Sequence, residues 1–196
     1  MIQPCPLQSA QALTQFGGAG PGGVWFGNDN TIGWTFDTCE IIEVTHLGLN
    51  AAHAGANDGL SQAHRIGIWD NAGNLLFSTT VGPGRGDVTA GPWEYAAVTP
   101  TMLGLGRYVI GAQYIVGSPE WTVAAPSTTD PALSYVEFRI GTGIDLPFPD
   151  QSFETLFVGP NFQFRAVPEP GVWALLMLAG CAVPIFRIFH SAKASR

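Results

Sequence analysis

Three histidines, at positions 46, 53 and 64, are the residues that could most directly hold a metal ion. A zinc site needs three or four convergent ligands, and no His-x-His or Cys-x-x-Cys spacing accompanies these histidines. In the run His64-Arg65-Ile66-Gly67-Ile68, strand alternation puts the imidazole on the same face as two isoleucines. We therefore expect His64 to be a buried, hydrogen-bonded structural histidine, and we assign no metal site and no cofactor.

The run Asp70-Asn71-Ala72-Gly73-Asn74 is rich in oxygen atoms, as a calcium loop would be. A calcium loop of the EF-hand type also needs acids at alternate positions and a closing glutamate, and Phe77 and Ser78 stand where further ligands are expected. The same five residues are typical of a tight turn between two strands. We interpret them as a hairpin turn.

Hydrolysis of a glycosidic bond would require two facing carboxylates, and sequence cannot show which acids face each other. The candidates are Glu40, Glu43, Asp87, Glu94, Glu120 and Glu137. No Gly-x-Ser-x-Gly elbow supplies a nucleophile, and the glycine-rich run 82–86 lacks the strand–loop–helix context of a phosphate site. We predict that the protein is not an enzyme, with a glycan hydrolase as the weaker alternative.

Aromatic side chains offer another chemistry, the stacking of sugar rings on a protein surface. The candidates for such a platform are Trp25, Trp69, Trp93, Tyr95 and Trp121. Large aromatic residues of a β-sandwich more often fill its core, and this interpretation is favoured. A carbohydrate-binding module that uses these aromatics for an extracellular polysaccharide remains the alternative function.

The elements that would position these residues are short strands. The clearest unit is a hairpin, with strands at 64–69 and 75–81 joined by the Asp/Asn/Gly turn. In residues 41–49, Ile42 and Val44 fall on one face but Leu47 and Leu49 on the other, and this phase slip near Thr45-His46 predicts a β-bulge.

Further strands are expected at 24–26, 33–37, 93–98, 108–116, 135–140 and 161–165. Pro100 is expected to end the strand at 93–98. In the strand at 135–140, Val136, Phe138 and Ile140 are expected to share the buried face. Eight to nine short strands with no amphipathic helix predict an all-β fold, an antiparallel β-sandwich or jelly roll over residues 32–166 that follows a Gly/Pro-rich lead-in at 1–31.

The charge of the chain divides unevenly along its 196 residues. Residues 1–166 carry five arginines against fourteen acids, whereas residues 167–196 carry three basic residues and one acid. The acidic body has no basic stripe that could neutralise phosphates, which disfavours nucleic acid as a partner. Few charges, many glycines and prolines, and 46% hydrophobic residues are typical of an exported β domain. Cys39 is expected to be a small buried hydrophobe.

The C-terminal tail, residues 167–196, combines three features in order. A rigid motif at 167–171 is followed by an uncharged apolar stretch at 172–186. Extended through Arg187 to Phe189, this stretch predicts a transmembrane helix at 172–189, and the basic tip is 187–196. Positive residues after the helix place the body outside the cytoplasmic membrane. The residues that carry these features are Val167, Pro168, Glu169 and Pro170 in the motif; Val172, Trp173, Leu175, Leu176, Leu178 and Phe186 in the helix; and Arg187, Lys193 and Arg196 in the tip.

In this order of motif, helix and basic tip, the tail resembles the PEP-CTERM sorting domain of bacterial exported proteins, which is also labelled an ice-binding-protein C-terminal domain. The resemblance implies that an exosortase, a membrane-embedded transpeptidase, recognises Pro168-Glu169-Pro170 and removes the tail, so that the body reaches the cell surface or extracellular matrix. An ordinary C-terminal membrane anchor is the alternative.

Residues 33–165 are also similar to uncharacterised bacterial extracellular β-sandwich domains, through segments such as Gly33-Trp34-Thr35-Phe36 and Ala63 to Asp70. That resemblance implies a fold and no activity. An exported chain should begin with a signal peptide, whereas Met1 to Pro6 has no basic region and no apolar core. We therefore expect the true start to lie upstream of Met1.

Overall fold

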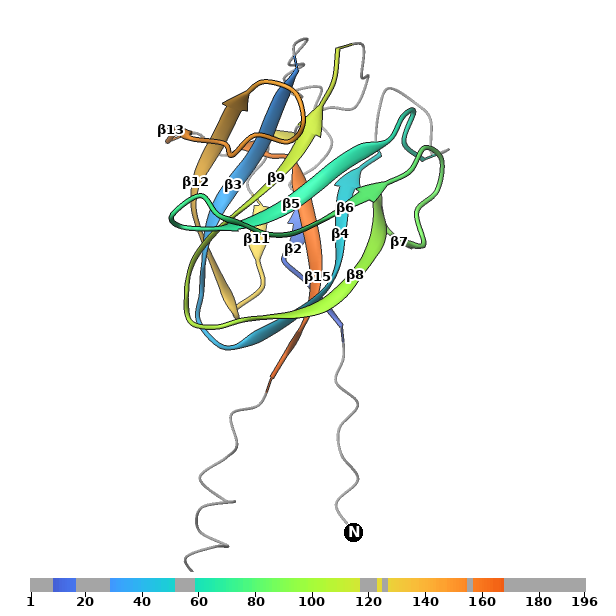
Figure 1. The fold of residues 1–196 in the computed structure, drawn as a ribbon. Coiled ribbons are helices and arrows are strands. Elements are labelled where there is room, and N and C mark those ends of the chain that lie inside the picture. Colours follow the sequence, from blue (N-terminus) through green and yellow to red (C-terminus); the bar gives the residue numbers. More distant parts are fainter. Residues whose placement is uncertain are drawn as a thin grey trace, which may run out of the picture.

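A computed structural model of the chain describes residues 9–16, 29–51, 59–116, 123–124, 127–154 and 157–167. These residues form an all-β, antiparallel fold, with no helix among them (Figure 1). The all-β prediction is therefore confirmed for the part of the chain that is described, and the expected strand at 24–26 lies outside it.

Most strands belong to two sheets. The first sheet has the order β1 (Ala10–Gln11), β15 (Pro160–Ala166), β4 (Ile42–Asn50), β8 (Trp93–Leu103) and β7 (Val88–Ala90). The second has the order β13 (Gln151–Phe153), β12 (Leu133–Thr142), β3 (Asn30–Thr38), β9 (Gly106–Tyr114), β5 (His64–Asp70) and β6 (Leu75–Val81). Two short ladders complete the fold: β2 (Leu13–Phe16) with β11 (Ser127–Thr129), and β10 (Val123–Ala124) with β14 (Phe157–Val158).

The strand pairings are nested along the chain. The hairpin β5–β6 is innermost, the pair β4–β8 encloses it, and the pair β3–β9 encloses both. Because β4 and β8 lie in one sheet and the other four strands in the other, the chain crosses between sheets at each level of nesting. Long-range pairing of this kind ties distant segments into one folding unit.

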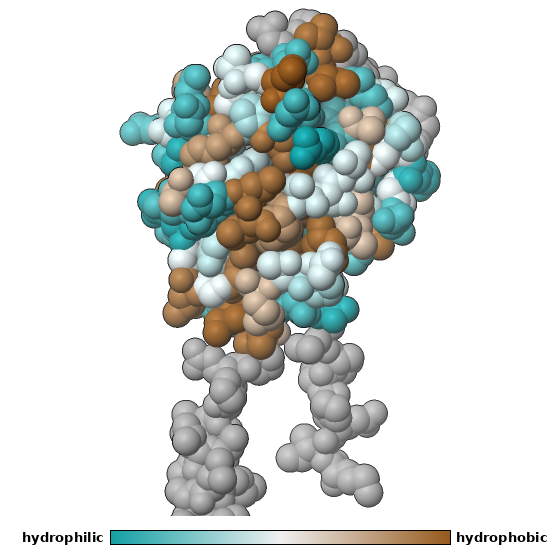
Figure 2. Space-filling model, in the orientation of Figure 1, coloured by the Kyte–Doolittle hydropathy of each residue, from teal (hydrophilic) through white to brown (hydrophobic). Residues whose placement is uncertain are grey.

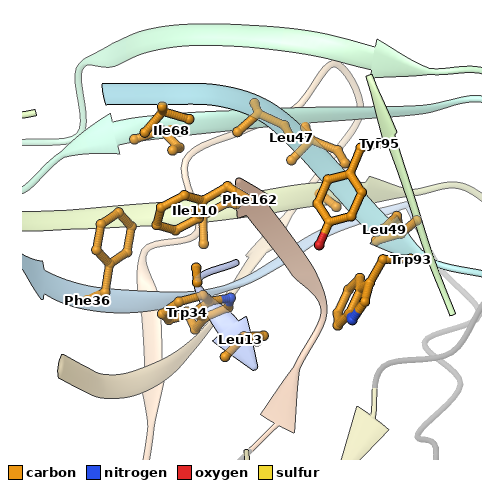
Figure 3. Close-up of a cluster of buried hydrophobic side chains, with 14 of the residues drawn as sticks. Leu13, Trp34, Phe36, Leu47, Leu49, Ile68, Trp93, Tyr95, Ile110 and Phe162 are labelled. Carbon is orange, nitrogen blue, oxygen red and sulfur yellow. The ribbon is translucent and has the colours of Figure 1, made fainter. Parts of the chain in front are cut away.

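Hydrophobic side chains from both sheets meet in one core (Figure 3). The indole of Trp34 on β3 stacks on Phe162 of β15 with ring centroids 6.2 Å apart, and Phe36 packs against the same phenyl ring at 5.0 Å. Trp34 also donates its indole N–H to the carbonyl oxygen of Pro160, at 2.8 Å. These contacts join the two sheets face to face, since β3 and β15 belong to different sheets.

The predicted β-bulge in β4 is confirmed. The register with β8 shifts between Val44 and His46, and the register with β15 shifts at the same level. The extra residue, Thr45, lets both halves of the strand point their apolar side chains inward, and Ile42, Val44, Leu47 and Leu49 are all 0% exposed.

The strand at 93–98 does not end at Pro100, and that prediction is wrong. β8 continues to Leu103, and its register with β4 passes from Ala97 directly to Thr101. Pro100 therefore lies in the irregular part of the ladder, where no partner requires its missing N–H. A bulge can carry a proline through a strand in this way.

The predicted faces of β12 are also only partly right. The register with β3 shifts between Tyr135 and Glu137, so Tyr135 rather than Val136 packs against the core together with Phe138 and Ile140. In β9 the expected alternation holds as far as Tyr114, whereas Val116 lies beyond the strand and is 64% exposed.

The segment at residues 9–16 contributes strands that the sequence did not indicate. Ala12 donates its N–H to Phe162 O and accepts from Asp130 N, and Ala12 and Leu13 are buried. The amide of Asn161, itself 0% exposed, accepts from Leu13 N at 3.0 Å and donates to Leu13 O at 3.3 Å. This segment is therefore fastened to the last strand of the fold.

A smaller hydrophobic cluster covers a row of glycines in the second sheet. Gly33, Gly111 and Gly67 lie side by side on β3, β9 and β5. A Cβ atom on Gly111 would lie 3.2 Å from the indole of Trp69, and one on Gly67 would lie equally close to it. Trp69 therefore lies along the row, where Val109, Leu146 and Phe148 join it.

Candidate binding pocket

A pocket of about 400 Å³ lies where the hairpin β7–β8 meets two loops. Its exposed rim is formed by Arg85, Thr89, Gly91 and Pro92, and its buried floor by Ala51, Gly59 and Glu94. Gly91 occupies the turn of the hairpin with φ of 62°, a left-handed conformation that favours glycine. The two loops are held together by a pair of hydrogen bonds between Leu60 and Gly84, of 2.9 and 2.7 Å.

Glu94 is the buried acid of this pocket and only 4% exposed. Its carboxylate oxygen Oε2 accepts hydrogen bonds from the Gly86 N–H at 2.7 Å and the Thr89 hydroxyl at 2.8 Å. Its other oxygen, Oε1, accepts no hydrogen bond from the described residues. It is not one of the buried side-chain atoms that lack a hydrogen-bond partner. The two bonds fix the carboxylate.

Among the described residues that line the pocket there is no aromatic side chain. The side chains on its wall are small or polar, apart from Arg85, whose guanidinium carries five N–H donors. The described lining thus includes one acid and one arginine, with little apolar surface.

Sequence reasoning did not single out this pocket. Glu94 is only one of the six candidate acids, Arg85 enters only as part of the glycine-rich run 82–86, and Thr89 is not among the sequence candidates. The available signal was the position of a glutamate inside the strand Trp93-Glu94-Tyr95-Ala96, where a charged residue falls among buried ones. The convergence of the loops at 59 and 84–86 on that strand is tertiary information.

His46 and His64 lie on strands of different sheets. His64 on β5 is 1% exposed, and because a carbonyl oxygen only accepts, its Nδ1–H donates to Gln113 O at 2.7 Å. This confirms the structural role expected for His64. His46 lies on β4 in the other sheet, where burial lowers its pKa against an opposing effect of Asp87. His53 lies outside the described residues, among which no group of three potential metal ligands occurs.

The run at 70–74 is a hairpin turn, as interpreted. Asp70 Oδ1 accepts from Ala72 N and Asn74 N, both at 2.9 Å, and Oδ2 accepts from the Asn74 side chain at 2.8 Å. These bonds lower the pKa of Asp70, with the Asn74 side chain as the largest cause. Both carboxylate oxygens are thus used within the turn itself.

The other candidate acids are dispersed. Glu137 on β12 pairs with Arg139 at 2.6 Å, and Glu43 on β4 pairs with Arg165 at 3.8 Å. Asp87 and Glu40 are exposed, and Glu120 lies outside the described residues. These two ion pairs lie on different sheets.

Three of the five aromatic candidates belong to the interior. Trp93 is 2% exposed and Tyr95 is 0% exposed, and both lie in the main core (Figure 3). Trp69 is also 2% exposed, as the favoured interpretation expected. Trp25 and Trp121 lie outside the described residues. Cys39, in contrast, is exposed between β3 and β4, so its expected burial is wrong.

The described chain ends at Val167, the first residue of the predicted sorting motif. Val167 donates its N–H to Ile41 O at 2.9 Å, one residue beyond β15. Pro168, Glu169, Pro170, the expected helix at 172–189 and the basic residues Arg187, Lys193 and Arg196 lie outside the described residues. Within the described part of the chain, no helix has the length and apolar character needed to cross a bilayer.

Comparison with known proteins gives no relative. No family model, curated protein or solved structure matches this chain. Functional inference therefore depends on its own residues and geometry.

Proposed function

We propose that this protein is an exported, non-enzymatic component of the envelope or extracellular matrix, with a jelly-roll sandwich as its body and a C-terminal tail for sorting. Tail processing would involve an exosortase-type membrane transpeptidase that recognises Pro168-Glu169-Pro170. Before processing, the apolar helix at 172–189 holds the body at the outer side of the cytoplasmic membrane. After processing, the body belongs to the cell surface or the matrix.

The observation that carries the proposal is that the described strand pairing ends at β15, directly before the predicted tail. β15 is hydrogen-bonded to β4 on one side and β1 on the other, and the last backbone bond of this end is that of Val167. The last core residue, Phe164, precedes the motif by three positions. A cut at the motif would therefore leave all described strand pairings intact, as a removable tail requires.

Apolar surface near the end of β15 also supports the proposal. Arg165 on β15 pairs with Glu43 on β4, and Glu43 pairs in turn with Met102 on β8. Met102 is 50% exposed, and Leu105 in the β8–β9 turn is 66% exposed. Figure 2 shows hydrophobic residues at this lower end of the body. Five residues of extended chain span at most about 18 Å, so the helix from Val172 would keep this end close to the bilayer.

Intact mass and fractionation in the native host, with and without its exosortase, test the proposal. In exosortase-positive cells we expect the mature protein to lack the basic tip and to leave the membrane fraction. Glu169→Gln should reduce processing, while Glu154→Gln on the exposed surface of the body should not. A mature protein that still ends at Arg196 in exosortase-positive cells would overturn the proposal.

A further inference from the structure

The turn between β8 and β9 holds an exposed leucine in a fixed position. Leu105 lies in this turn and is 66% exposed. The buried hydroxyl of Thr38 donates to Gly104 O at 2.7 Å and accepts from the Gly106 N–H at 2.9 Å, so it holds the backbone on both sides of the leucine. The Tyr108 hydroxyl also donates to Gly104 O, at 3.2 Å. The turn therefore presents an apolar side chain to the outside without any need to rearrange.

This turn lies at the end of the body where β15 ends. Ile42 pairs with Leu103 on one side and with Ala166 on the other, so the last residues of β8 and β15 are two strand spacings, about 10 Å, apart. Figure 1 shows both strands reaching this end of the body. Met102, which is 50% exposed, adds a second large apolar side chain beside the turn. Exposed apolar surface thus gathers close to the point where the chain leaves its last strand.

Two ion pairs flank this apolar surface. Arg107 donates to both carboxylate oxygens of Asp37, at 2.8 and 2.9 Å. Glu43, the partner of Met102 in the sheet, is paired with Arg165 at 3.8 Å. Paired charges cost less to bring close to an apolar medium than single charges, because each compensates the other. These surroundings therefore allow the turn to approach an apolar surface.

The position of the tail selects the occupant, and in this respect the inference rests on the proposed function. The proposed membrane helix begins at Val172, five residues after Val167, and these residues span at most about 18 Å of extended chain. The tail thus brings a bilayer, rather than a protein, to this end of the body, and exposed apolar patches are one mark of membrane contact. We propose that Leu105, with Met102 beside it, inserts into the outer leaflet of the membrane and orients the body against the bilayer.

Nitroxide labels on the full-length chain in phosphatidylcholine nanodiscs measure this contact. Each label is attached to a single introduced cysteine, after Cys5, Cys39 and Cys181 have been changed to serine. Molecular oxygen concentrates in hydrocarbon and a charged nickel chelate stays in water, so the ratio of their collision rates with the label reports contact with lipid. The ratio at Leu105→Cys should be several times the ratio at Val116→Cys.

Val116 is the matched control for Leu105. It is 64% exposed against 66% for Leu105, and the nine residues of β9, about 30 Å of strand, lie between them. A ratio at position 105 no higher than at position 116 would overturn the proposal.

A label at Leu176→Cys, in the predicted helix, tests the membrane anchor by itself. Lipid contact at position 176 without contact at position 105 overturns the insertion of the turn and leaves the proposed tail in place. Contact at position 105 without contact at position 176 supports the insertion and contradicts the proposed tail. The two proposals can therefore fail separately.

A polar substitution separates insertion of Leu105 from simple proximity to the bilayer. Leu105→Gln nearly keeps the size of the side chain but removes its apolar character, so it should lower the ratio at a label on Met102→Cys to the level found at position 116. Val116→Gln should leave the ratio at position 102 unchanged. A ratio at position 102 that stays high in Leu105→Gln would mean that the short tail alone holds this end at the membrane, and it would overturn the proposal. Spin–spin broadening between labels at position 105 of neighbouring chains, without lipid contact, would place a second copy of the chain there and would also overturn it.

Discussion

Asn161 connects more segments of the body than its size suggests. Its Nδ2 donates to Leu13 O and to the Tyr95 hydroxyl at 2.9 Å, and its Oδ1 accepts from Leu13 N and Phe162 N. Gly48 lies between Asn161 and Tyr95 in the sheet, and a Cβ on Gly48 would collide with the Tyr95 ring at 2.3 Å. The absence of a side chain on β4 thus lets a phenol on β8 reach an amide on β15.

Replacement of the Asn161 side chain should destabilise the fold. Asn161→Ala leaves the buried N–H and carbonyl of Leu13 and the Tyr95 hydroxyl without their partner, so we expect a loss of about 3 kcal/mol in the free energy of unfolding. Urea denaturation measures it, with Asn71→Ala in the exposed hairpin turn as control. A loss in Asn161→Ala no larger than in the control would show that the hub contributes little.

Two tyrosines should make the fold sensitive to alkali. Burial raises the pKa of Tyr135 to about 12, with a smaller contribution from Glu137, and burial raises the pKa of Tyr95 further. An unfolded tyrosine has a pKa of about 10, so above that pH the unfolded chain has lost protons that the folded chain keeps. Stability from these groups is complete below pH 10 and is lost as the pH rises through the folded pKa of about 12.

We therefore expect the urea midpoint to be constant from about pH 7 to 9 and to fall steeply between about pH 10 and 12. Tyr135→Phe and Tyr95→Phe should each reduce this slope, because phenylalanine does not titrate. Equal slopes in both variants and the unmodified chain would mean that other groups cause the alkaline transition.

At the scale of elements, the bulge in β4 decides which side chains enter the core. A shift of one residue turns every later side chain of a strand to the opposite face. Deletion of Thr45 would therefore turn either Ile42 and Val44 or Leu47 and Leu49 away from the core, and we expect no cooperative unfolding transition in that variant.

Thr45→Ala is the matched control for this deletion. It keeps the residue count and removes the hydroxyl and the γ-methyl group. Because the hydroxyl donates to Gln163 O at 3.3 Å, we expect a loss of about 1 kcal/mol in the free energy of unfolding. Differential scanning calorimetry compares the two variants. A deletion variant with a cooperative transition near that of Thr45→Ala would mean that the strand restores its register by another route.

The row of Gly33, Gly111 and Gly67 limits which side chains fit at these positions of the second sheet. A Cβ on Gly111 would lie 2.7 Å from Thr31 and 3.2 Å from Trp69, so Gly111→Val should displace the indole and the covering loop at 143–150. We expect a loss of about 2 kcal/mol from overpacking and faster proteolysis in that loop. Gly82→Val, at a position with open space, should change neither.

Local sequence patterns predicted those parts of the fold whose interaction partners lie close by in the sequence. The hairpin around residues 70–74 and the bulge at Thr45 are both visible as periodicity and turn chemistry in a short window. The continuation of β8 through Pro100 and the burial of Ala12 and Leu13 were not visible in such a window, because each depends on a strand far away in sequence. The pocket follows the same division, since Glu94 stands in a recognisable strand while Ala51, Gly59 and Arg85, which also line it, come from other segments of the chain.

At the scale of the whole molecule, the body closes on itself just before the tail begins. β15 fills the position between β1 and β4, and its side chains Phe162 and Phe164 are 0% and 1% exposed. The final strand is thus indispensable, and the tail of the proposed sorting function begins directly after it. The proposal therefore assigns stability and sorting to adjacent stretches of chain.

Two truncations test this separation. A chain that ends at Val167 should have the same free energy of unfolding as the full chain to within about 0.5 kcal/mol, because it retains every described strand pair. A chain that ends at Phe162 loses Phe164 from the core and the pairing of residues 164–166 with β4, and it should lose at least about 4 kcal/mol. Urea denaturation gives the comparison, with the full chain in nanodiscs and the truncated chains in buffer. The full chain in buffer with lipid-free scaffold protein shows whether the medium itself changes the free energy of unfolding. If the chain ending at Val167 were as unstable as the one ending at Phe162, the tail would be part of the fold, and an enzyme could not remove it without unfolding the body.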